Sequence, residues 1–384
     1  MTRTTVLIKN LTRNRLRTTL TVLAIALPMF VFTMARTMVE QVHEMLAESD
    51  LKLRVAVHQK LSFTSPLPQR IREEIEGLAP EGYITAVCRT SWFGGRIEGK
   101  PAAFASMAVD RDTFAKVYAE FEITPAENER FQEERRAAMV SPELAKSQNW
   151  KVGDRVTLTG SLPPNPKMEF VIVAIPPKMS RQWFYFAMDY YDETLRKLTG
   201  SPAGVNNFWV KCSSPEARQW ALTAIDKHFA SSENETRTEL ESTFFAQFMK
   251  SGGDWVGLTW NVGRLIVLVA VAVAFNTMSM SFRERTREIA VLRTLGFSAG
   301  KIVRMVLSEG VLLGLIGGLI AVGPIYALTH LTEFSIPRMG TMQIPNQTAA
   351  IALAVACLCG LLAALVPALM AGRLKVATAL RKVV

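Results

Sequence analysis

The chain has 384 residues, of which 49% are hydrophobic and 20% are charged, and its formal net charge is +10. The hydrophobic residues gather in long uncharged runs, which excludes a protein that is soluble along its whole length. Basic charge is common in nucleic-acid-binding proteins, but here it lies beside the apolar runs. We therefore expect no nucleic-acid partner.

Four of the uncharged runs are long enough to cross a bilayer, because about 20 apolar residues in a helix span the hydrocarbon core. In chain order they centre on residues 18–35, 265–282, 310–329 and 349–371. The four predicted transmembrane helices, with their flanks, are 18–37, 255–282, 309–330 and 348–372. Trp255, Trp260 and Arg264 are suited to the outer interface of the second helix.

The distribution of charge predicts the orientation. The two termini and residues 283–309 together carry 15 basic and 3 acidic residues, whereas residues 36–264 carry 28 basic and 30 acidic ones. Positive residues favour the cytoplasmic side in short loops. We therefore expect a multi-pass protein of the cell inner membrane with both termini inside, including the tail 373–384, and with 38–254 and 331–347 outside.

The N-terminal segment 1–17 is basic and cytoplasmic in this topology. Residues 5–17 are predicted to form an amphipathic helix on anionic membrane lipid, or alternatively only a positive flank that sets the topology. We interpret 18–35 as an uncleaved signal anchor. A cleaved signal peptide is disfavoured because Met34-Ala35-Arg36 is a poor cleavage site.

The segment between the first two predicted spans alternates short strand and helix patterns. Predicted strands are 51–57, 83–93, 102–109, 155–160, 168–175, 183–188 and 206–212, and predicted helices are 68–78, 111–121, 141–148, 189–199 and 215–230. A hairpin is expected around Gly94-Gly95. The fold class is therefore an α-helical membrane protein with four transmembrane helices and a large α+β extracytoplasmic domain inserted between the first two.

Helical spacing continues past the first span through 36–49, and it precedes the second span at 237–250. These two segments are expected to form a stalk, or alternatively to be amphipathic helices packed on the base of the domain. Gly252-Gly253 would break or hinge the second one.

The cysteines predict little. Cys88 and Cys212 are both assigned outside, where the compartment permits a disulfide, but nothing in their spacing requires one. Cys357 and Cys359 lie in the fourth span and are expected to pack as small apolar groups.

Two short segments match catalytic motifs, but each lacks a residue or a neighbouring element that the motif requires. Residues 94–100 have the spacing of a phosphate loop, but Pro101 replaces the required Ser or Thr. Residues 296–300 match a nucleophile elbow, but a helix is expected before them, with Gly296 as its C-terminal cap and Ser298 as the next N-cap. The histidines do not cluster. We expect no catalytic site, no metal and no cofactor bound by this chain.

Residues 283–308, between the second and third spans, carry charges interleaved with apolar residues. Arg283 and Arg287, and Glu284 and Glu288, would be unfavourable like-charge neighbours in a continuous helix. A docked partner would offset that cost. The alternative, a solvated positive loop, explains the arginines but not the apolar residues.

The same region carries a family resemblance. Residues 278–298, MSMSFRERTREIAVLRTLGFS, are followed at 309–318 by EGVLLGLIGG. These runs resemble the MacB/FtsX/LolC-E superfamily of ABC transporter permeases. Residues 140–145, VSPELA, and 151–158, KVGDRVTL, resemble part of the MacB-like periplasmic core domain.

The resemblance implies a mechanotransmission permease. Its coupling helix, mapped onto Arg283–Gly296, would dock on a cytoplasmic ABC ATPase in a separate chain, which would bind ATP and Mg²⁺. The implied coupling residues are Arg283, Glu284, Arg287, Glu288, Arg293, Leu295 and Gly296. A second permease, identical or related, would complete the dimer, with close helix contacts at Gly314, Gly317 and Gly318.

We predict a role in export or periplasmic substrate handling. Within the family, the alternatives are lipoprotein release and FtsX-like control of an extracellular cell-wall hydrolase. Outside it, the alternative is a membrane-anchored receptor without an ATPase. A periplasmic adaptor is a further candidate partner. The sequence leaves open the substrate, and whether the two permeases are identical.

Overall fold

A computed structural model describes residues 15–99, 103–179, 182–251, 253–332, 335–336, 340–341 and 343–374. The chain divides into two compact units. The helical unit comprises Met1–His43, Gly252–Ser335 and Thr341–Val384, and the sheet unit comprises Glu44–Ser251 and Ile336–Gly340. The predicted amphipathic helix at 5–17 lies almost wholly outside the described residues, and so does most of the predicted tail 373–384.

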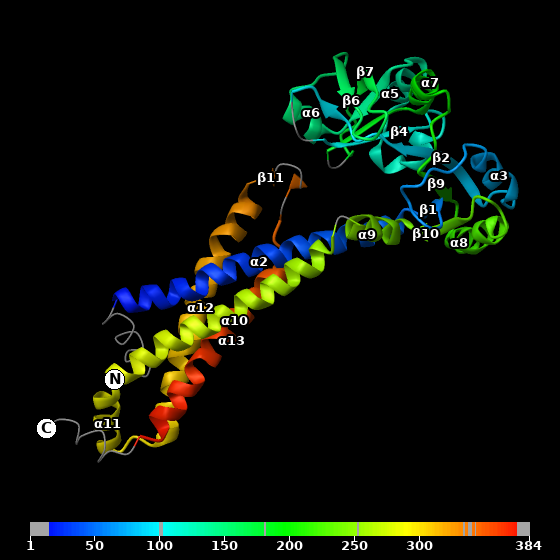
Figure 1. The fold of residues 1–384 in the computed structure, drawn as a ribbon. Helices are drawn as coiled ribbons and strands as arrows, with labels where there is room; N and C mark the ends of the chain where they lie inside the picture. Colours follow the sequence, from blue (N-terminus) through cyan, green and yellow to red (C-terminus); the bar gives the residue numbers. More distant parts are fainter. Residues whose placement is uncertain are drawn as a thin grey trace. The chain divides into compact units, whose positions relative to one another are not determined.

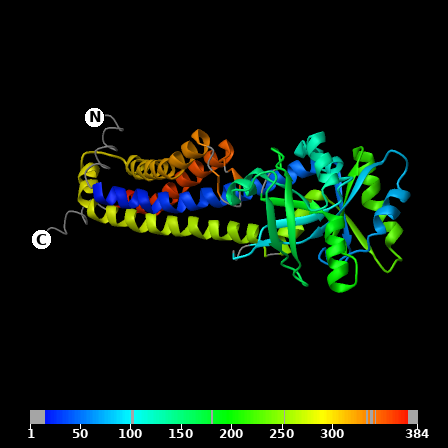
Figure 2. The ribbon, with the colours of Figure 1, turned by 90° about the horizontal axis from the view of Figure 1, so that it is seen from above.

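The helical unit is built from long helices that pack together (Figure 1, Figure 2). Within the described residues, four helices are long and apolar enough to cross a membrane. They are α2 (Arg15–Leu51), α10 (Trp255–Glu284), α12 (Ala299–Leu331) and α13 (Asn346–Gly372). All four contribute to one cluster, with Met29 from α2, Ala274 from α10, Leu313 from α12 and Ala356 from α13.

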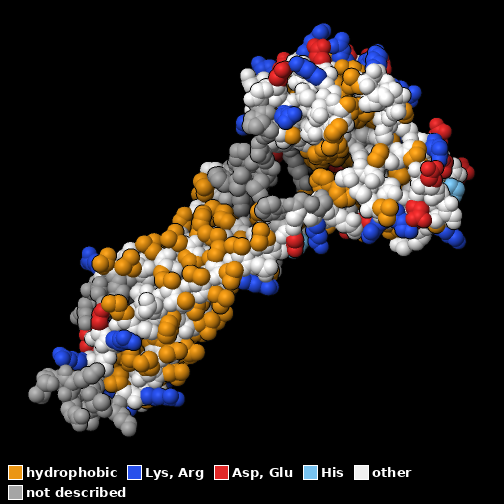
Figure 3. Space-filling view, viewed as in Figure 1, with side chains coloured by type: hydrophobic (Ala, Val, Ile, Leu, Met, Phe, Trp, Pro, Cys, Tyr) orange, Lys and Arg blue, Asp and Glu red, His pale blue; other side chains and the backbone are white. Residues whose placement is uncertain are grey.

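The outward faces of these helices are also apolar. Leu27, Leu268, Leu319 and Leu365 are among the large hydrophobic residues that remain exposed on the unit. Figure 3 shows such side chains gathered along the helices. Exposed apolar surface of this extent suits a hydrocarbon environment better than water.

Two helices differ in extent from the prediction. α2 continues to Leu51, so the expected helix over 36–49 is present. α12 begins at Ala299, directly after the predicted N-cap residue Ser298, and continues without a break through the predicted span 309–330. Its first turns bury Ile302 and Val306 against neighbouring helices, so the helix that follows Ser298 and the third span form one element.

Aromatic and basic residues meet near the start of α10. The guanidinium of Arg36 lies 5.9 Å from the ring centre of Trp260, and that of Arg264 lies 5.5 Å from it. Such cation–π contacts are favourable. They suit the interfacial positions that the sequence predicted for Trp260 and Arg264; the side chain of Trp255 lies outside the described residues.

The sheet unit is organised around a mixed sheet of ten described strands (Figure 1), in the order β10-β1-β9-β2-β4-β8-β5-β7-β6-β3. The pairs β4–β8 and β5–β7 are parallel and the others are antiparallel. The strands are β1 (Arg54–Gln59), β2 (Ile84–Trp92), β3 (Arg96–Ile97), β4 (Ala105–Val109), β5 (Ala137–Val140), β6 (Arg155–Thr159), β7 (Lys167–Ala174), β8 (Trp183–Ala187), β9 (Asn207–Cys212) and β10 (Thr236–Leu240). Two-residue strands β11 (Ser335–Ile336) and β12 (Gly340–Thr341) pair separately.

Helices cover both faces of the sheet. They are α3 (Ile71–Leu78), α4 (Phe114–Val117), the 3₁₀ helix η1 (Ala119–Phe121), α5 (Pro125–Glu133), α6 (Pro142–Gln148), α7 (Met188–Thr199), α8 (Pro215–Phe229) and α9 (Glu241–Ser251). Along β9, Phe208 and Val210 pack under α8, whereas Trp209 faces the opposite side and packs with α4 and α9. Successive side chains of a strand alternate between faces, so burial of both faces explains the almost continuously apolar strands.

The predicted α+β fold class is confirmed, with local corrections. Residues 237–240 are strand β10, because Thr238 pairs with Val57 of β1, so the helix begins only at Glu241. The predicted helix 111–121 is shorter and divides into α4 and η1. The strands expected on either side of Gly94-Gly95 do pair antiparallel, because Ser91 of β2 lies opposite Ala108 of β4. Their connection is longer than a tight turn, and it contains strand β3, which pairs with β6.

The predicted break before the second span is present. α9 ends at Ser251, α10 begins at Trp255, and Gly253 adopts a φ of +111°. A residue with a Cβ rarely adopts this backbone conformation. The helical path is therefore interrupted here, whereas α2 has no such interruption.

All four cysteines are free. Cys88 pairs in register with Trp209, and Cys212 lies at the other end of the same strand pair, so the disulfide left open by the sequence does not form. Burial raises the pKa of the Cys88 thiol and raises the pKa of Cys212 to about 11. Both thiols therefore remain protonated near neutral pH and pack as apolar groups.

A buried ion pair joins β1 to α9. The Arg54 Nε and Nη2 atoms each lie 2.8 Å from a carboxylate oxygen of Glu241, and both side chains are almost fully buried. Arg54 Nη1 also donates to the carbonyl of Val117 at 2.7 Å. Removing one partner of such a pair leaves an uncompensated charge in the interior.

We predict that Arg54→Met destabilises the chain by about 3–5 kcal/mol, because Glu241 would stay buried without its cation. The double variant Arg54→Met/Glu241→Leu should recover most of the loss. The measurement is thermal unfolding of the full chain in detergent, followed by near-ultraviolet circular dichroism. Arg70→Met is the matched control: its pair with Glu74 is exposed, so a change within about 1 kcal/mol is expected. A loss in the control equal to that in Arg54→Met would contradict the assignment.

Candidate functional site

The connection between α10 and α12, residues 283–298, contains the predicted coupling residues. It holds a short helix, α11 (Thr286–Thr294), rather than the continuous helix expected over 283–295. The interruption falls at Arg285, which ends α10 with φ −97° and ψ 9°. The expected like-charge neighbours therefore do not share one helix: Arg283 and Glu284 end α10, whereas Arg287 and Glu288 begin α11.

The end of α11 is set by Gly296, whose φ is +88°. The amide of Gly296 donates to the carbonyl of Arg293 at 3.1 Å, and the amide of Phe297 donates to that of Leu292 at 3.1 Å. These two bonds form a Schellman motif, which favours glycine at this position. The predicted C-terminal cap is confirmed, and Ser298 then precedes α12 in extended conformation as its N-cap residue.

One face of α11 is buried against the membrane-length helices. Ile289 and Ala290 are the buried residues of α11. Ile289 shares a cluster with Ile302 and Val306 from the start of α12, and with Ala368 and Ala371 from the end of α13. This packing holds α11 on the ends of two helices and fixes which of its sides faces outward.

The opposite face of the connection is exposed and partly apolar. The exposed fractions are 49% for Val291, 70% for Leu295 and 45% for Phe297. Among the predicted coupling residues, Arg283, Glu284, Arg287, Leu295 and Gly296 are exposed, whereas Glu288 and Arg293 are half-buried. We name Val291, Leu295 and Phe297, with the neighbouring Arg287, the exposed α11 face.

An ion pair that the sequence did not predict anchors this connection. Arg285 Nη1 lies 3.0 and 3.2 Å from the two carboxylate oxygens of Glu309, and Arg285 Nε lies 3.5 Å from Glu288. Glu309 is 8% exposed and belongs to α12. An acidic residue within a membrane-length helix is costly unless it is paired, so Glu309 itself was the signal for a partner nearby.

The predicted packing glycines lie at contacts within this chain. A Cβ at Gly314 would overlap the carbonyl oxygen of Ala356 on α13, and one at Gly318 would lie 2.8 Å from the Ala356 Cβ. A Cβ at Gly317 would lie 3.0 Å from Ile25 on α2. We expected these glycines between two permeases. The space beside them is instead filled by the chain's own helices.

The motif matches gain no support from the fold. Helix α11, not a strand, precedes residues 296–300, so the geometry of a nucleophile elbow is missing. Gly94 is followed by strand β3 in the described part of that loop, and Lys100 and Pro101 lie outside it. No group of three or more potential metal ligands occurs among the residues that the structure describes.

This connection and its flanking helices match a known protein family. Residues 262–376 match the family described as FtsX-like permease C-terminal. These residues form an FtsX-like permease domain. The domain spans most of α10, all of α11 and α12, and α13, and the predicted resemblance to FtsX-like ABC permeases is confirmed.

Two relatives from Bacillus subtilis (strain 168) support the assignment of the FtsX-like domain. The chain is 28% identical over 207 residues to "ABC transporter permease YtrF", covering 51% of this chain and 45% of that protein. It is 40% identical over 63 residues to "Uncharacterized ABC transporter permease YknZ", covering 16% of each. The chain thus matches less than half the length of either relative.

Solved structures are more distant. The extracellular domain of the noncanonic ABC-type transporter YknZ from Gram-positive bacteria matches 48% of this chain and 99% of that structure, at 10% identity and a TM-score of 0.34. A domain of a putative permease protein from Porphyromonas gingivalis matches 50% of this chain and 88% of that structure, at 13% identity and a TM-score of 0.31.

We predict that Gly314→Ala destabilises the FtsX-like domain by about 1–3 kcal/mol, because the added Cβ forces α12 away from α13. Gly323→Ala in the same helix is the control, since a Cβ there meets no atom within 4 Å. Thermal unfolding of the two variants in detergent measures the difference. Equal stabilities would show that the close contact is not needed.

We predict that Arg285→Gln destabilises the connection by about 1–3 kcal/mol, because Glu309 loses its charged partner. Arg283→Gln removes an exposed arginine two residues away and should change stability by less than about 0.5 kcal/mol. Hydrogen exchange of the α11 amides, compared between the variants, tests the effect locally. Faster exchange in both variants, or in neither, would contradict the role of the ion pair.

Proposed function

We propose that this chain is the permease subunit of an ABC transporter, and that a separate cytoplasmic ATPase drives it. The FtsX-like domain and the names of the two relatives support this proposal. The chain would be a non-catalytic subunit of the inner membrane with both termini in the cytoplasm. ATP and Mg²⁺ would be bound by the ATPase, and a second permease would complete the assembly.

The observation that carries the proposal is the exposed α11 face. Val291 and Leu295 lie four residues apart and are both exposed, so they lie on the same side of the helix. The buried side of α11 packs on α12 and α13, which leaves this side available to a partner. The face includes exposed Arg287, and exposed Arg283 lies nearby in the chain, so the matching ATPase surface would be an apolar groove with an acidic rim.

We propose that movement of the ATPase reaches the sheet unit through α2. This helix runs without interruption from Arg15 to Leu51, whereas the second connection is broken between Ser251 and Trp255. A continuous helix transmits displacement along its axis, and a break at glycine absorbs it. The work done on the substrate, in export or in periplasmic handling, would follow from that motion.

We predict that Leu295→Asp abolishes ATPase docking. Leu295 is 70% exposed, so the substitution should leave folding intact while placing a desolvated charge in the contact. The tagged chain is co-expressed with candidate ABC ATPases of the source organism and purified in detergent. We expect at least a tenfold loss of recovered ATPase for Leu295→Asp relative to the unsubstituted chain.

Leu61→Asp is the matched control. Leu61 is 89% exposed and belongs to the sheet unit, so its substitution should not change ATPase recovery. Recovery of no ABC ATPase with the unsubstituted chain would favour a receptor that works without one. Undiminished recovery with Leu295→Asp would place the contact elsewhere.

A further inference from the structure

The sheet unit contains a cavity of about 90 Å³ between the last turns of α2 and one face of the sheet. Trp209 of β9, Met107 of β4 and Tyr185 of β8 form part of its wall. The strand registers place these three on the same face, because Trp209 pairs with Cys88 of β2, and Met107 pairs with both Trp92 of β2 and Tyr185. The aromatic wall residues are Tyr118, Phe121, Trp183, Tyr185, Trp209 and Phe245.

The aromatic walls are fixed by packing. Trp183 stacks on Tyr185 with ring centres 5.6 Å apart, and Trp209 stacks on Phe245 at 5.7 Å. The Arg54 guanidinium lies 4.4 Å from the ring centre of Tyr118. Rings held in this way present preformed apolar surfaces, as ligand sites usually do.

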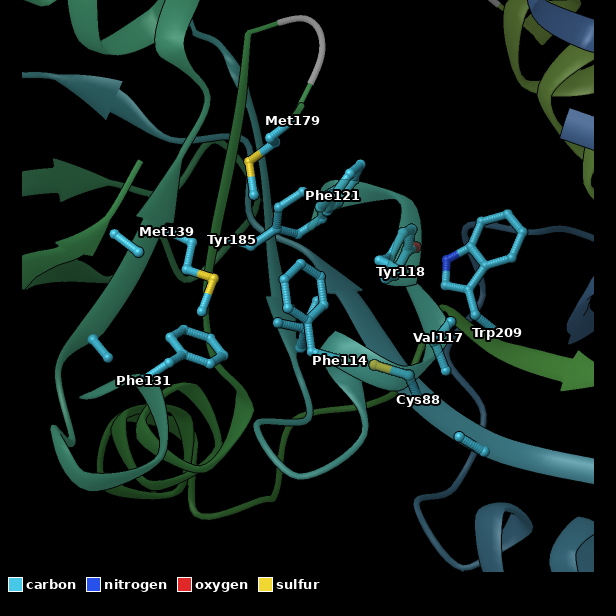
Figure 4. Packing of buried hydrophobic residues seen from close by; sticks show 14 of the residues in the cluster. Cys88, Phe114, Val117, Tyr118, Phe121, Phe131, Met139, Met179, Tyr185 and Trp209 are labelled. Carbon is cyan, nitrogen blue, oxygen red and sulfur yellow. The ribbon is translucent and has the colours of Figure 1, made fainter. Parts of the chain in front are cut away.

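Trp209 contributes a buried hydrogen-bond donor to this wall. Trp209 is 2% exposed, and its indole Nε1 finds no hydrogen-bond acceptor among the residues that the structure describes. Figure 4 shows the indole nitrogen on the side that faces Tyr118, another wall residue. A buried donor without an acceptor is unfavourable, so the cavity favours an occupant that supplies an acceptor.

The charges around the cavity indicate whether the hydrogen-bond acceptor of an occupant is charged or neutral. Arg54 is bound to Glu241, and Lys52 lies 3.6 Å from Glu120, so both wall cations are paired with wall carboxylates. Glu48 adds a further negative charge. An anion would meet these carboxylates, and an ammonium group could not accept a hydrogen bond from Trp209. A neutral carbonyl satisfies both conditions.

We propose that this cavity binds a small, neutral, apolar molecule through a carbonyl group that accepts a hydrogen bond from Trp209 Nε1. The apolar body would lie against the aromatic rings. Met45, Glu48 and Ser49 of α2 belong to the wall, so the occupant touches the helix whose earlier residues form the first membrane-length segment. The site does not depend on the proposed docking of an ATPase.

The test uses the full chain in detergent, labelled with 5-fluorotryptophan and observed by ¹⁹F NMR. The Trp209 resonance is assigned from its loss in Trp209→Phe. N-butylacetamide is titrated as the neutral carbonyl probe, with butyrate and butylammonium as charged probes of similar size. We expect a saturable shift of the Trp209 resonance with the amide alone. The Trp150 resonance should not move, because Trp150 packs with Phe104 and Phe184 on the other face of the sheet.

Two variants locate the site. Met107→Trp fills the cavity and should weaken binding of N-butylacetamide at least tenfold. Trp209→Phe keeps an aromatic ring but removes the donor, and the same loss is expected in ligand-observed saturation-transfer NMR. No saturable response to the amide would show that the cavity holds only water. Equal responses to all three probes, a response to butylammonium alone, or unchanged binding by Trp209→Phe would also overturn the proposal.

Discussion

Close contact between the backbones of α12 and α13 is the constraint on which the placement of α11 depends. A Cβ at Gly310 would overlap the carbonyl oxygen of Gly360, and a Cβ at Gly360 would overlap that of Gly310. Only glycine on both sides permits this approach. The ends of the same two helices supply Ile302, Val306, Ala368 and Ala371 as the floor under α11. The orientation of the exposed α11 face therefore follows from the glycine contact.

An arginine–carboxylate pair joins neighbouring elements in each of the two units, fully buried in the sheet unit and part-buried in the helical unit. Arg285 and Glu309 tie the start of α11 to α12, and Arg54 and Glu241 tie β1 to α9. A guanidinium can satisfy both oxygens of a carboxylate at once, which fixes direction as well as distance. Such pairs contribute little net stability compared with apolar residues of similar volume. Their value here is that each one specifies the geometry of a junction between a helix and its neighbour.

The two proposals concern different units of the chain and different kinds of ligand. The exposed α11 face offers apolar and basic side chains to a protein partner, whereas the cavity beside Trp209 offers aromatic rings and one donor to a small molecule. The last turns of α2 line that cavity, and its earlier residues pack with α10, α12 and α13. An occupant of the cavity would thus contact α2, a helix with residues in both units.

The sequence by itself determined the four membrane-length helices, the α+β class of the inserted segment and the glycine cap of α11. These depend on local composition and on short-range periodicity, which any stretch of chain carries within itself. Tertiary structure decided what depends on distant neighbours. Strand β10 formed where a helix was expected because β1 offered it a partner, and the orientation of α11 follows from its apolar contacts with α12 and α13. Arg285 became an anchor only because Glu309, 24 positions along the chain, lies opposite it. The unpaired indole of Trp209 likewise exists only because strands far apart in the sequence meet around one cavity.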